Sequence, residues 1–266
     1  NQATAAVGAS TSAPSSGGGK MTDVGVPRKE TLVVDMLNGR VPNANQLNPY
    51  LPGVAYQGSG FRQFVWEPLW EVDSVKGKQF PLLAATMAEP VDSSMTKFRF
   101  KLREGVKWSD GVELTSEDVV FTSEMLLKTK ELAYSGAYSS TIKKMTAVDK
   151  YTIEVETVKP EARLEQFLGV TVVDTNFKIV PKHIWEKNDP KTFQNTQSIA
   201  SGPYILKNKD PQGNWFLFEK RSDWKNSATG IVGGEPTPKY VLFRTYGPEE
   251  KRVMAAIQND LDILTD

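Results

Sequence analysis

The stretch Phe98–Phe121, FRFKLREGVKWSDGVELTSEDVVF, predicts a strand, a tight turn and a capped helix in direct succession. Its first residues alternate apolar with basic side chains, the period-two pattern of a strand with one buried face. Ser109-Asp110-Gly111 has turn chemistry, because aspartate bonds to nearby backbone and glycine tolerates positive φ. Thr115 precedes Asp118 by three residues, so its hydroxyl can cap a helix expected over 116–128. The block predicts local structure and is silent on function.

Patterns outside this block predict further strands and helices. Apolar runs or alternation favour strands, over 31–37, 151–158, 204–207, 215–220 and 240–245. Helical patterns cover 161–168, 181–187 and 249–259. In the last of these helices Val253, Ala256 and Ile257 have core spacing. Strands alternate with helices, so the expected fold class is mixed α/β or α+β.

Composition excludes several classes of protein. The 266 residues contain 32 Lys+Arg and 32 Asp+Glu, so no net charge draws the chain to nucleic acid or an anionic membrane. The absence of cysteine removes disulfides, thiolate metal sites and cysteine nucleophiles. No apolar run approaches the roughly 18–20 residues that a membrane helix needs.

The first twenty residues, NQATAAVGASTSAPSSGGGK, form a Ser/Ala/Gly/Thr tract without an aromatic residue. Such a tract buries too little apolar surface to offset its ordering entropy, so we expect residues 1–20 to be a flexible spacer. A lipoprotein-type spacer behind a lipid anchor and an expression linker both fit this composition.

Several motifs in one order carry a family resemblance. They are Asn48-Pro49, Trp66-Glu67-Pro68-Leu69, Pro81-Leu82-Leu83-Ala84, the run LREGVKWSDGVELTSEDVVF, Asp149-Lys150-Tyr151-Thr152-Ile153, Val180-Pro181-Lys182-His183-Ile184-Trp185, Ser201-Gly202-Pro203-Tyr204 and Leu261-Asp262-Ile263. This series resembles the bacterial extracellular solute-binding proteins of family 5, the oligopeptide-, dipeptide-, nickel- and oligosaccharide-binding subunits of ABC importers. The departure is Ser201, where the family usually has Thr or Asn.

The resemblance implies a type II (cluster C) periplasmic-binding-protein fold, with two lobes around a cleft. Lobe one would comprise 20–63 and 169–266, the latter running to the hinge, and an extra α+β domain would comprise 64–168. The second lobe would be missing, which makes the chain an N-terminal fragment in this interpretation.

The resemblance also implies ligand-binding residues in lobe one. They are Asn38, Gly39 and Arg40 after the first strand, Pro52, Gly53, Val54, Ala55, Tyr56 and Gln57 in the following loop, and Tyr204 near the hinge. The implied function is capture of an extracytoplasmic oligopeptide or oligosaccharide for a membrane ABC permease. The parent protein would be periplasmic or lipid-anchored at the cell surface; no catalysis, cofactor, metal or nucleic-acid partner is implied.

Two other functions remain open from the residues alone. A secreted hydrolase would need paired carboxylates, and the candidates are Asp110, Glu113, Glu117 and Asp118. Turn and cap positions already account for three of the four. His183 is the only histidine and lies in an apolar helix start, so we expect a structural or surface role. The third possibility is an interaction module that binds no solute.

Overall fold

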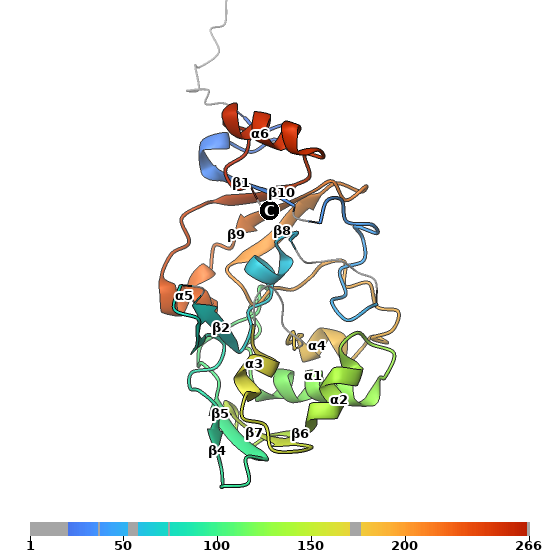
Figure 1. Cartoon of the computed structure of the whole chain (residues 1–266), viewed down its shortest axis with the longest axis vertical. Helices are drawn as coiled ribbons and strands as arrows, with labels where there is room; N and C mark the ends of the chain where they lie inside the picture. Colours follow the sequence, from blue (N-terminus) through green and yellow to red (C-terminus); the bar gives the residue numbers. More distant parts are fainter. Residues whose placement is uncertain (1–20, 37, 53–57, 74, 171–176, 265–266) are drawn as a thin grey trace, which may run out of the picture.

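The computed structural model describes residues 21–36, 38–52, 58–73, 75–170 and 177–264. Two four-stranded sheets lie at opposite ends of an elongated molecule, with a two-stranded hairpin between them (Figure 1). Helices pack beside both sheets, so the expected mixed α/β class is confirmed.

Strands and helices alternate in groups along the chain. The strands are β1 (Thr31–Asp35), β2 (Trp70–Asp73), β3 (Lys78–Pro81), β4 (Glu89–Pro90), β5 (Lys97–Lys101), β6 (Ile142–Ala147), β7 (Thr152–Thr157), β8 (Tyr204–Lys209), β9 (Trp215–Lys220) and β10 (Tyr240–Arg244). The helices are α1 (Ser116–Lys128), α2 (Ser135–Thr141), α3 (Leu164–Leu168), α4 (Lys182–Trp185), α5 (Ala228–Gly233) and α6 (Glu249–Ile257), with short helical turns η1 (Arg28–Glu30), η2 (Phe61–Val65) and η3 (Trp224–Asn226).

The upper sheet of Figure 1 has the strand order β1-β10-β9-β8. β1 pairs in parallel with β10, with Val33 opposite Leu242, and the remaining pairs are antiparallel. Beyond β1, Ile263 forms a parallel bridge with Val34 and accepts a hydrogen bond from Asp35 N at 3.0 Å. The sheet therefore joins segments that lie more than 200 residues apart in sequence.

Each face of the upper sheet is covered by a different set of apolar residues. On one face Phe61 of η2 packs edge-on against Phe216 and Phe218, with ring centroids 5.4 and 5.2 Å away. On the other face Val33 and Leu242 cluster with Leu261 and with Ala255 of α6. The apolar residues of β1 and β10 thus pack on both faces, with Leu32 only partly buried, as in parallel sheets generally.

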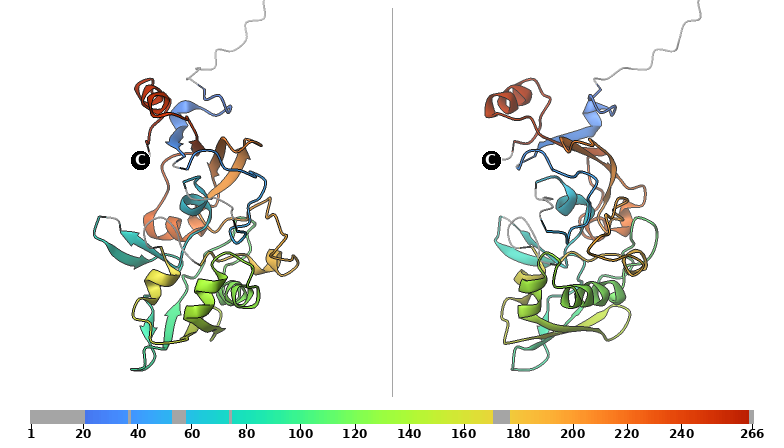
Figure 2. Two further views of the ribbon diagram at one scale, coloured as in Figure 1. Left: turned by 45° about the vertical axis from the view of Figure 1, so that its right-hand side comes forward. Right: turned by 90° about the vertical axis from the view of Figure 1, so that its right-hand side faces the viewer.

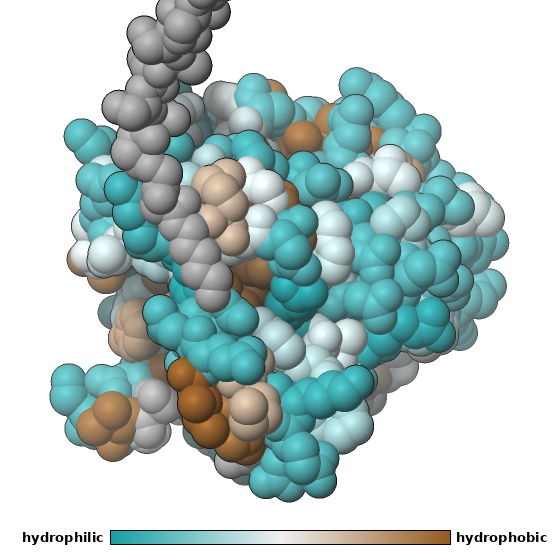
Figure 3. All heavy atoms as spheres, turned by 90° about the horizontal axis from the view of Figure 1, so that it is seen from above, coloured by the Kyte–Doolittle hydropathy of each residue, from teal (hydrophilic) through white to brown (hydrophobic). Residues whose placement is uncertain are grey.

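The expected core face of α6 is wrong for two of its three residues. Val253 is 42% exposed and Ile257 is 72% exposed, whereas Ala256 is partly buried against the core and its neighbour Ala255 is 8% exposed. The rotation of α6 is set by contacts that periodicity does not encode: Ala255 packs on the sheet, and Arg252 Nη1 lies 3.1 Å from Oδ2 of buried Asp35. Seen from this end of the molecule, apolar surface lies among hydrophilic surface (Figure 3).

The lower sheet has the order β4-β5-β7-β6 and is antiparallel. Side chains in β5 alternate between exposed and buried, as predicted, and Phe100 faces Ile153 of β7 in register. α1 and α2 lie on the side of this sheet that faces the rest of the molecule (Figure 2). Trp70 of β2 packs against Phe100 with ring centroids 4.9 Å apart, which links the hairpin to this core.

The predicted cap of α1 is confirmed. The Thr115 side chain accepts a hydrogen bond from Glu117 N, and the Asp118 carboxylate accepts one from Thr115 N at 2.9 Å, forming a capping box. Asp118 also accepts a hydrogen bond from Lys182 N at 2.9 Å. One acidic residue therefore caps α1 and holds the start of α4 against it.

Arg221 connects the upper and lower parts of the molecule. Its side chain is 2% exposed and forms an ion pair with Asp223 at 2.8 Å. The guanidinium donates to the carbonyl oxygens of Lys107 at 3.2 Å, Trp108 at 3.2 Å and Gly202 at 3.1 Å. The turn after β5 is thereby fixed to the turn before β8.

Glu67 is a second buried ionisable group, 6% exposed. Its two carboxylate oxygens accept hydrogen bonds from Ala228 N at 2.9 Å and Thr229 N at 2.6 Å. Burial raises the pKa of Glu67, although bonds from Thr229 and Ala228 and the charge of Arg221 act to lower it. Glu67 anchors the first turn of α5 beside the chain that leads into β2.

The domain boundaries expected at 64 and 168 stay predictions. The core cluster that contains the lower sheet also includes Tyr50, Phe177 and Trp185, which lie outside 64–168.

We expect Arg221→Ala to lower the free energy of unfolding by about 3–5 kcal/mol, because it leaves buried carbonyls and Asp223 without their partner. Urea denaturation followed by circular dichroism measures the change. Arg99→Ala, which removes an exposed ion pair with Glu154, is the control and should cost less than about 1 kcal/mol. Equal losses in the two variants would contradict this role of Arg221.

Thr115→Ala should lower the free energy of unfolding by about 1 kcal/mol, since the first turn of α1 loses its hydroxyl cap. Thr115→Ser keeps the hydroxyl and should recover most of that loss. If the serine variant is as unstable as the alanine variant, the cap is not what Thr115 contributes.

Glu67→Gln should change how stability depends on pH. The folded-state pKa of Glu67 is raised. Glu67 therefore adds most to the free energy of unfolding below its unfolded-state pKa, and this stabilisation is lost as pH rises through the folded-state pKa. The stability of the wild type relative to Glu67→Gln should therefore be greatest near pH ~4 and fall toward pH ~8. Denaturation at both pH values measures this difference, and a constant difference would contradict the raised pKa.

Candidate functional site

The chain leaves β1 through three of the predicted ligand-binding residues. Gly39 has a φ of +68° and its N–H donates to Met36 O at 2.9 Å, which turns the chain at the carboxyl end of the strand. Asn38 and Arg40 on either side of it are exposed. The sharp turn thus places two polar side chains at the surface.

Arg40 lines a groove of about 620 Å³, which we call the Arg40 groove. Its other lining residues come from the chain after Arg40, from the segment before β8 and from the β8–β9 turn: Pro42, Asn43, Ala44, Asn45, Gln46, Gln194, Pro211 and Gln212. Asn38 and Pro52 are not among the lining residues, so the structure does not bring all the predicted residues into one groove.

The walls of the Arg40 groove are held together by backbone contacts. Val41 N donates to Gly213 O at 3.0 Å, and Leu47 N donates to Gln194 O at 2.8 Å. Gly213 has a φ of +77°, and a Cβ there would lie 1.9 Å from Val41 O. Only glycine allows the β8–β9 turn to approach the backbone of Val41 this closely, so this side of the groove is fixed by backbone packing.

The lining of the Arg40 groove suits a polar ligand. Five of the nine lining residues carry side-chain carboxamides, which both donate and accept hydrogen bonds. Arg40 adds a cation with five donors, which can bind a carboxylate or carbonyl oxygens. Near this groove the pKa of Asp210 is lowered: burial raises it, but hydrogen bonds from Asn214 and Gln212 and the charge of Arg40 outweigh that effect.

Pro52 is exposed at the end of a segment that is well anchored. Buried Tyr50 donates its hydroxyl to Lys178 O at 2.5 Å and accepts from Lys178 N at 2.8 Å. The predicted residues Gly53, Val54, Ala55, Tyr56 and Gln57 lie outside the described residues.

Tyr134 lies beside this anchor and was not predicted. Its φ of +68° is unusual for an aromatic residue, and such backbone outliers cluster at functional sites. Lys178 Nζ lies 4.3 Å from the centre of the Tyr134 ring, and Ala133 N donates to Tyr50 O at 2.7 Å. The sequence does not mark Tyr134 as a candidate, because neither composition nor hydrophobic pattern reveals a tyrosine with a positive φ.

Tyr204 occupies the core of the upper sheet. It is 1% exposed, its hydroxyl donates to Pro238 O at 2.6 Å, and its ring lies 5.2 Å from that of Phe64. Burial raises its pKa to about 12. Ligand contact by Tyr204 stays a prediction, and this packing counts against it.

The carboxylates considered for hydrolysis have structural partners. Asp110 Oδ2 lies 2.7 Å from His183 Nε2, which joins the turn after β5 to α4. Glu113 contacts Lys150 Nζ at 2.8 Å and the Tyr151 hydroxyl, and these hydrogen bonds lower its pKa.

Glu117 contacts Lys182 Nζ at 2.8 Å, which lowers the pKa of the glutamate. Together with the cap role of Asp118, the turn and cap interpretation of this block agrees with the structure. Among the described residues no group of three or more His, Asp and Glu side chains is arranged to hold a metal ion.

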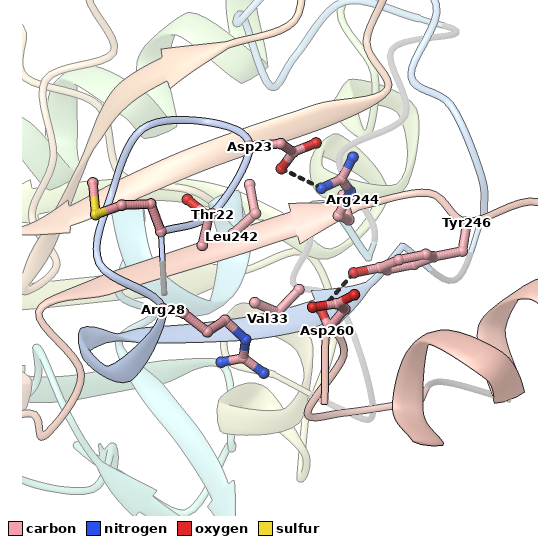
Figure 4. A pocket seen from close by; sticks show the side chains of 9 residues that line it. Thr22, Asp23, Arg28, Val33, Leu242, Arg244, Tyr246 and Asp260 are labelled. Carbon is pink, nitrogen blue, oxygen red and sulfur yellow. Dashed lines mark hydrogen bonds and ion pairs between the residues drawn. The ribbon is translucent and has the colours of Figure 1, made fainter. Parts of the chain in front are cut away.

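A second pocket, of about 360 Å³, lies on the α6 side of the upper sheet (Figure 4). Val33 and Leu242 point into it between two polar contacts, Arg244 Nη1 to Asp23 Oδ1 at 2.6 Å and the Tyr246 hydroxyl to Asp260 O at 2.7 Å. Met21, Val33 and Leu242 are the apolar members of its lining, and the other lining residues are polar. Arg244 Nε is buried without a hydrogen-bond partner among the described residues.

The helices of the described part of the chain are all too short or too polar to cross a membrane.

Comparisons with known proteins place this geometry in a family. The model of the bacterial extracellular solute-binding proteins, family 5 Middle, matches residues 80–266. A probable peptide-binding protein, YejA of Agrobacterium fabrum, is 27% identical over 192 residues, which are 69% of this chain and 29% of that protein. Protein XP55 of Streptomyces lividans is 31% identical over 183 residues, 68% of this chain and 31% of that protein.

Among solved structures, a periplasmic oligopeptide-binding protein of an oligopeptide ABC transporter from Thermotoga maritima superposes with a TM-score of 0.75. It is 27% identical, and the match covers 88% of this chain and 41% of that chain. The same protein has also been solved with mannohexaose bound. In four curated relatives, the stretch that matches this chain covers only 25–32% of the relative's length.

The family match covers well over half of the chain, and the fold agrees with it. This chain belongs to the bacterial extracellular solute-binding proteins of family 5.

Proposed function

We propose that the protein to which this chain belongs captures an oligopeptide or oligosaccharide outside the cytoplasm and delivers it to an ABC permease. In this proposal the chain supplies lobe one, from 20–63 and 169–266, together with an extra domain from 64–168. A second lobe closes over the ligand, and closure is selected by ligand contacts on both lobes. A lipid anchor before residue 1 would hold the protein at the membrane.

The family match over residues 80–266 is the observation that carries this proposal. The relatives support both ligand classes: one is described as a probable peptide-binding protein, and the Thermotoga protein named for oligopeptides has been solved with a mannohexaose. Hydroxyl-rich sugars and peptide groups both match the paired donors and acceptors of side-chain carboxamides.

Within this chain, the Arg40 groove and the surface around Pro52 and Tyr134 are the places that we propose for ligand contact. The groove has fixed walls and a polar lining. Tyr134 offers an aromatic ring held in an unusual backbone conformation. Aromatic rings serve both classes of ligand, by packing on apolar side chains or on sugar faces.

Arg40→Ala in the longer protein should weaken ligand binding by about tenfold, because one charge-assisted hydrogen bond is lost. Isothermal titration calorimetry against a peptide library and a cello-oligosaccharide series measures this and identifies the ligand class. Arg163→Ala, which removes an exposed arginine of the proposed extra domain, is the control and should bind as the wild type does.

The 266-residue chain alone should bind the same ligand weakly or not at all, since one lobe provides only part of the enclosure. Tight binding by this chain would contradict the two-lobe proposal. Unchanged binding in Arg40→Ala would remove the Arg40 groove from the site while leaving the two-lobe proposal standing. Turnover of a chromogenic glycoside or peptide would instead support the hydrolase alternative.

A further inference from the structure

Helix α6 presents its large apolar residues to the outside. The apolar residues that it packs on the upper sheet are the small Ala255 and Ala256. Val253, Met254 and Ile257 are 42%, 50% and 72% exposed. In α1, by contrast, every large apolar residue is buried or partly buried. The outer side of α6 therefore lacks the cover that the apolar face of a helix normally has.

The three exposed residues form one surface, which we call the α6 patch. Ile257 lies three residues after Met254 and four after Val253, and residues at these spacings are neighbours on a helix. Apolar and hydrophilic surface adjoin at this end of the molecule (Figure 3). Contiguous apolar surface with a polar rim marks a site of interaction, whereas single exposed apolar residues do not.

The surroundings of the α6 patch do not suit a lipid surface. Helices that lie on membranes carry Lys and Arg on their polar face. The first turn of α6 instead carries Glu249 and Glu250, and Arg252 is paired with Asp35 at 3.1 Å. Glu250 precedes Val253 by three residues, so a membrane would meet a carboxylate on the same face as the patch.

The α6 patch is also too small to hold a second copy of the chain. A stable interface buries about 800 Å² on each partner, from about 20–30 residues. The patch offers three residues, or five if Ile263 and Leu264, which are 42% and 44% exposed, are included. A segment of the same polypeptide needs less contact area, because its tether raises its effective concentration.

The relatives contain additional chain that could supply such a segment. The match to the Thermotoga protein covers 41% of that chain, so more than half of it has no counterpart in these 266 residues. The last described residues lie at the edge of the sheet on which α6 packs: Ile263 bridges to Val34, and Asp262 N donates to Val33 O at 2.9 Å. Chain that continues from here starts on the sheet that α6 covers.

From this combination we propose that the α6 patch is the docking surface for a later segment of the same polypeptide, one that follows Asp266 in the longer protein and presents apolar side chains. The segment covers Val253, Met254 and Ile257, and their removal from water stabilises the longer protein. The inference rests on the proposed function only in treating this chain as part of a longer protein.

A photo-crosslinker on the patch identifies the occupant. In the longer protein, Ile257→p-benzoylphenylalanine should crosslink within one polypeptide to a residue after Asp266, mapped by mass spectrometry of the digested product. The same replacement of Val148 is the control, since Val148 is 52% exposed in the β6–β7 turn at the opposite end of the molecule (Figure 1), and it should give no such crosslink. Crosslinks from position 257 only to residues 1–266, only to a second molecule, or to nothing would overturn the proposal.

Thiol labelling measures how well the patch is covered, because the chain has no cysteine of its own. Ile257→Cys should react with N-ethylmaleimide at least about tenfold more slowly in the longer protein than in the 266-residue chain. Val148→Cys should react equally fast in both. Equal rates for Ile257→Cys in the two proteins would contradict the docking of a later segment, and so would protection that grows with protein concentration, which points to a second copy.

Stability gives an independent reading. Ile257→Ser should lower the midpoint of thermal unfolding of the longer protein by more than about 3 °C, since a buried apolar side chain is lost, and should change that of the 266-residue chain little. An equal shift in the two proteins would overturn the proposal. All three measurements are made without ligand, so their failure leaves solute capture standing, and a longer protein that binds no solute would still show the crosslink.

Discussion

The buried guanidinium of Arg221 is the interaction on which the arrangement of the two sheets depends. It bonds to the carbonyl oxygens of Lys107 and Trp108 in the turn after β5 and to that of Gly202 before β8. A planar group with five donors can satisfy several carbonyls at once, which a lysine cannot. Because the pair with Asp223 removes the cost of an isolated buried charge, the junction is both polar and fixed.

That fixed junction gives a rigid support to the surfaces proposed for ligand contact. The Arg40 groove is walled by segments from 40–46, 194 and 211–212, which lie far apart in the sequence and are joined by the hydrogen bonds from Val41 N to Gly213 O and from Leu47 N to Gln194 O. Gly213 allows the closest of these contacts. The proposed two-lobe capture needs each lobe to move as a unit, and a groove held by backbone contacts is compatible with that proposal.

Much of the fold could be predicted from local patterns, because the physics that forms those elements is local. The capping box of α1 depends on residues three apart, and the alternation of β5 depends on nearest neighbours. The outward face of α6 could not be predicted, since its rotation depends on Arg252 meeting Asp35 across 217 residues. Of the candidate site residues, Arg40 was predicted from the sequence and lines a groove, whereas Tyr134 became a candidate only through its backbone conformation; ligand contact by either stays a prediction.

The sequence by itself determined the family, the mixed α/β class and the start of α1, because each of these is written in contiguous motifs such as Leu102–Phe121. Only the tertiary structure decided which polar groups share a surface. It placed Tyr204 in the core and paired the four candidate carboxylates with structural partners. These side-chain environments arise from contacts between distant segments, and no local sequence pattern specifies which segments meet.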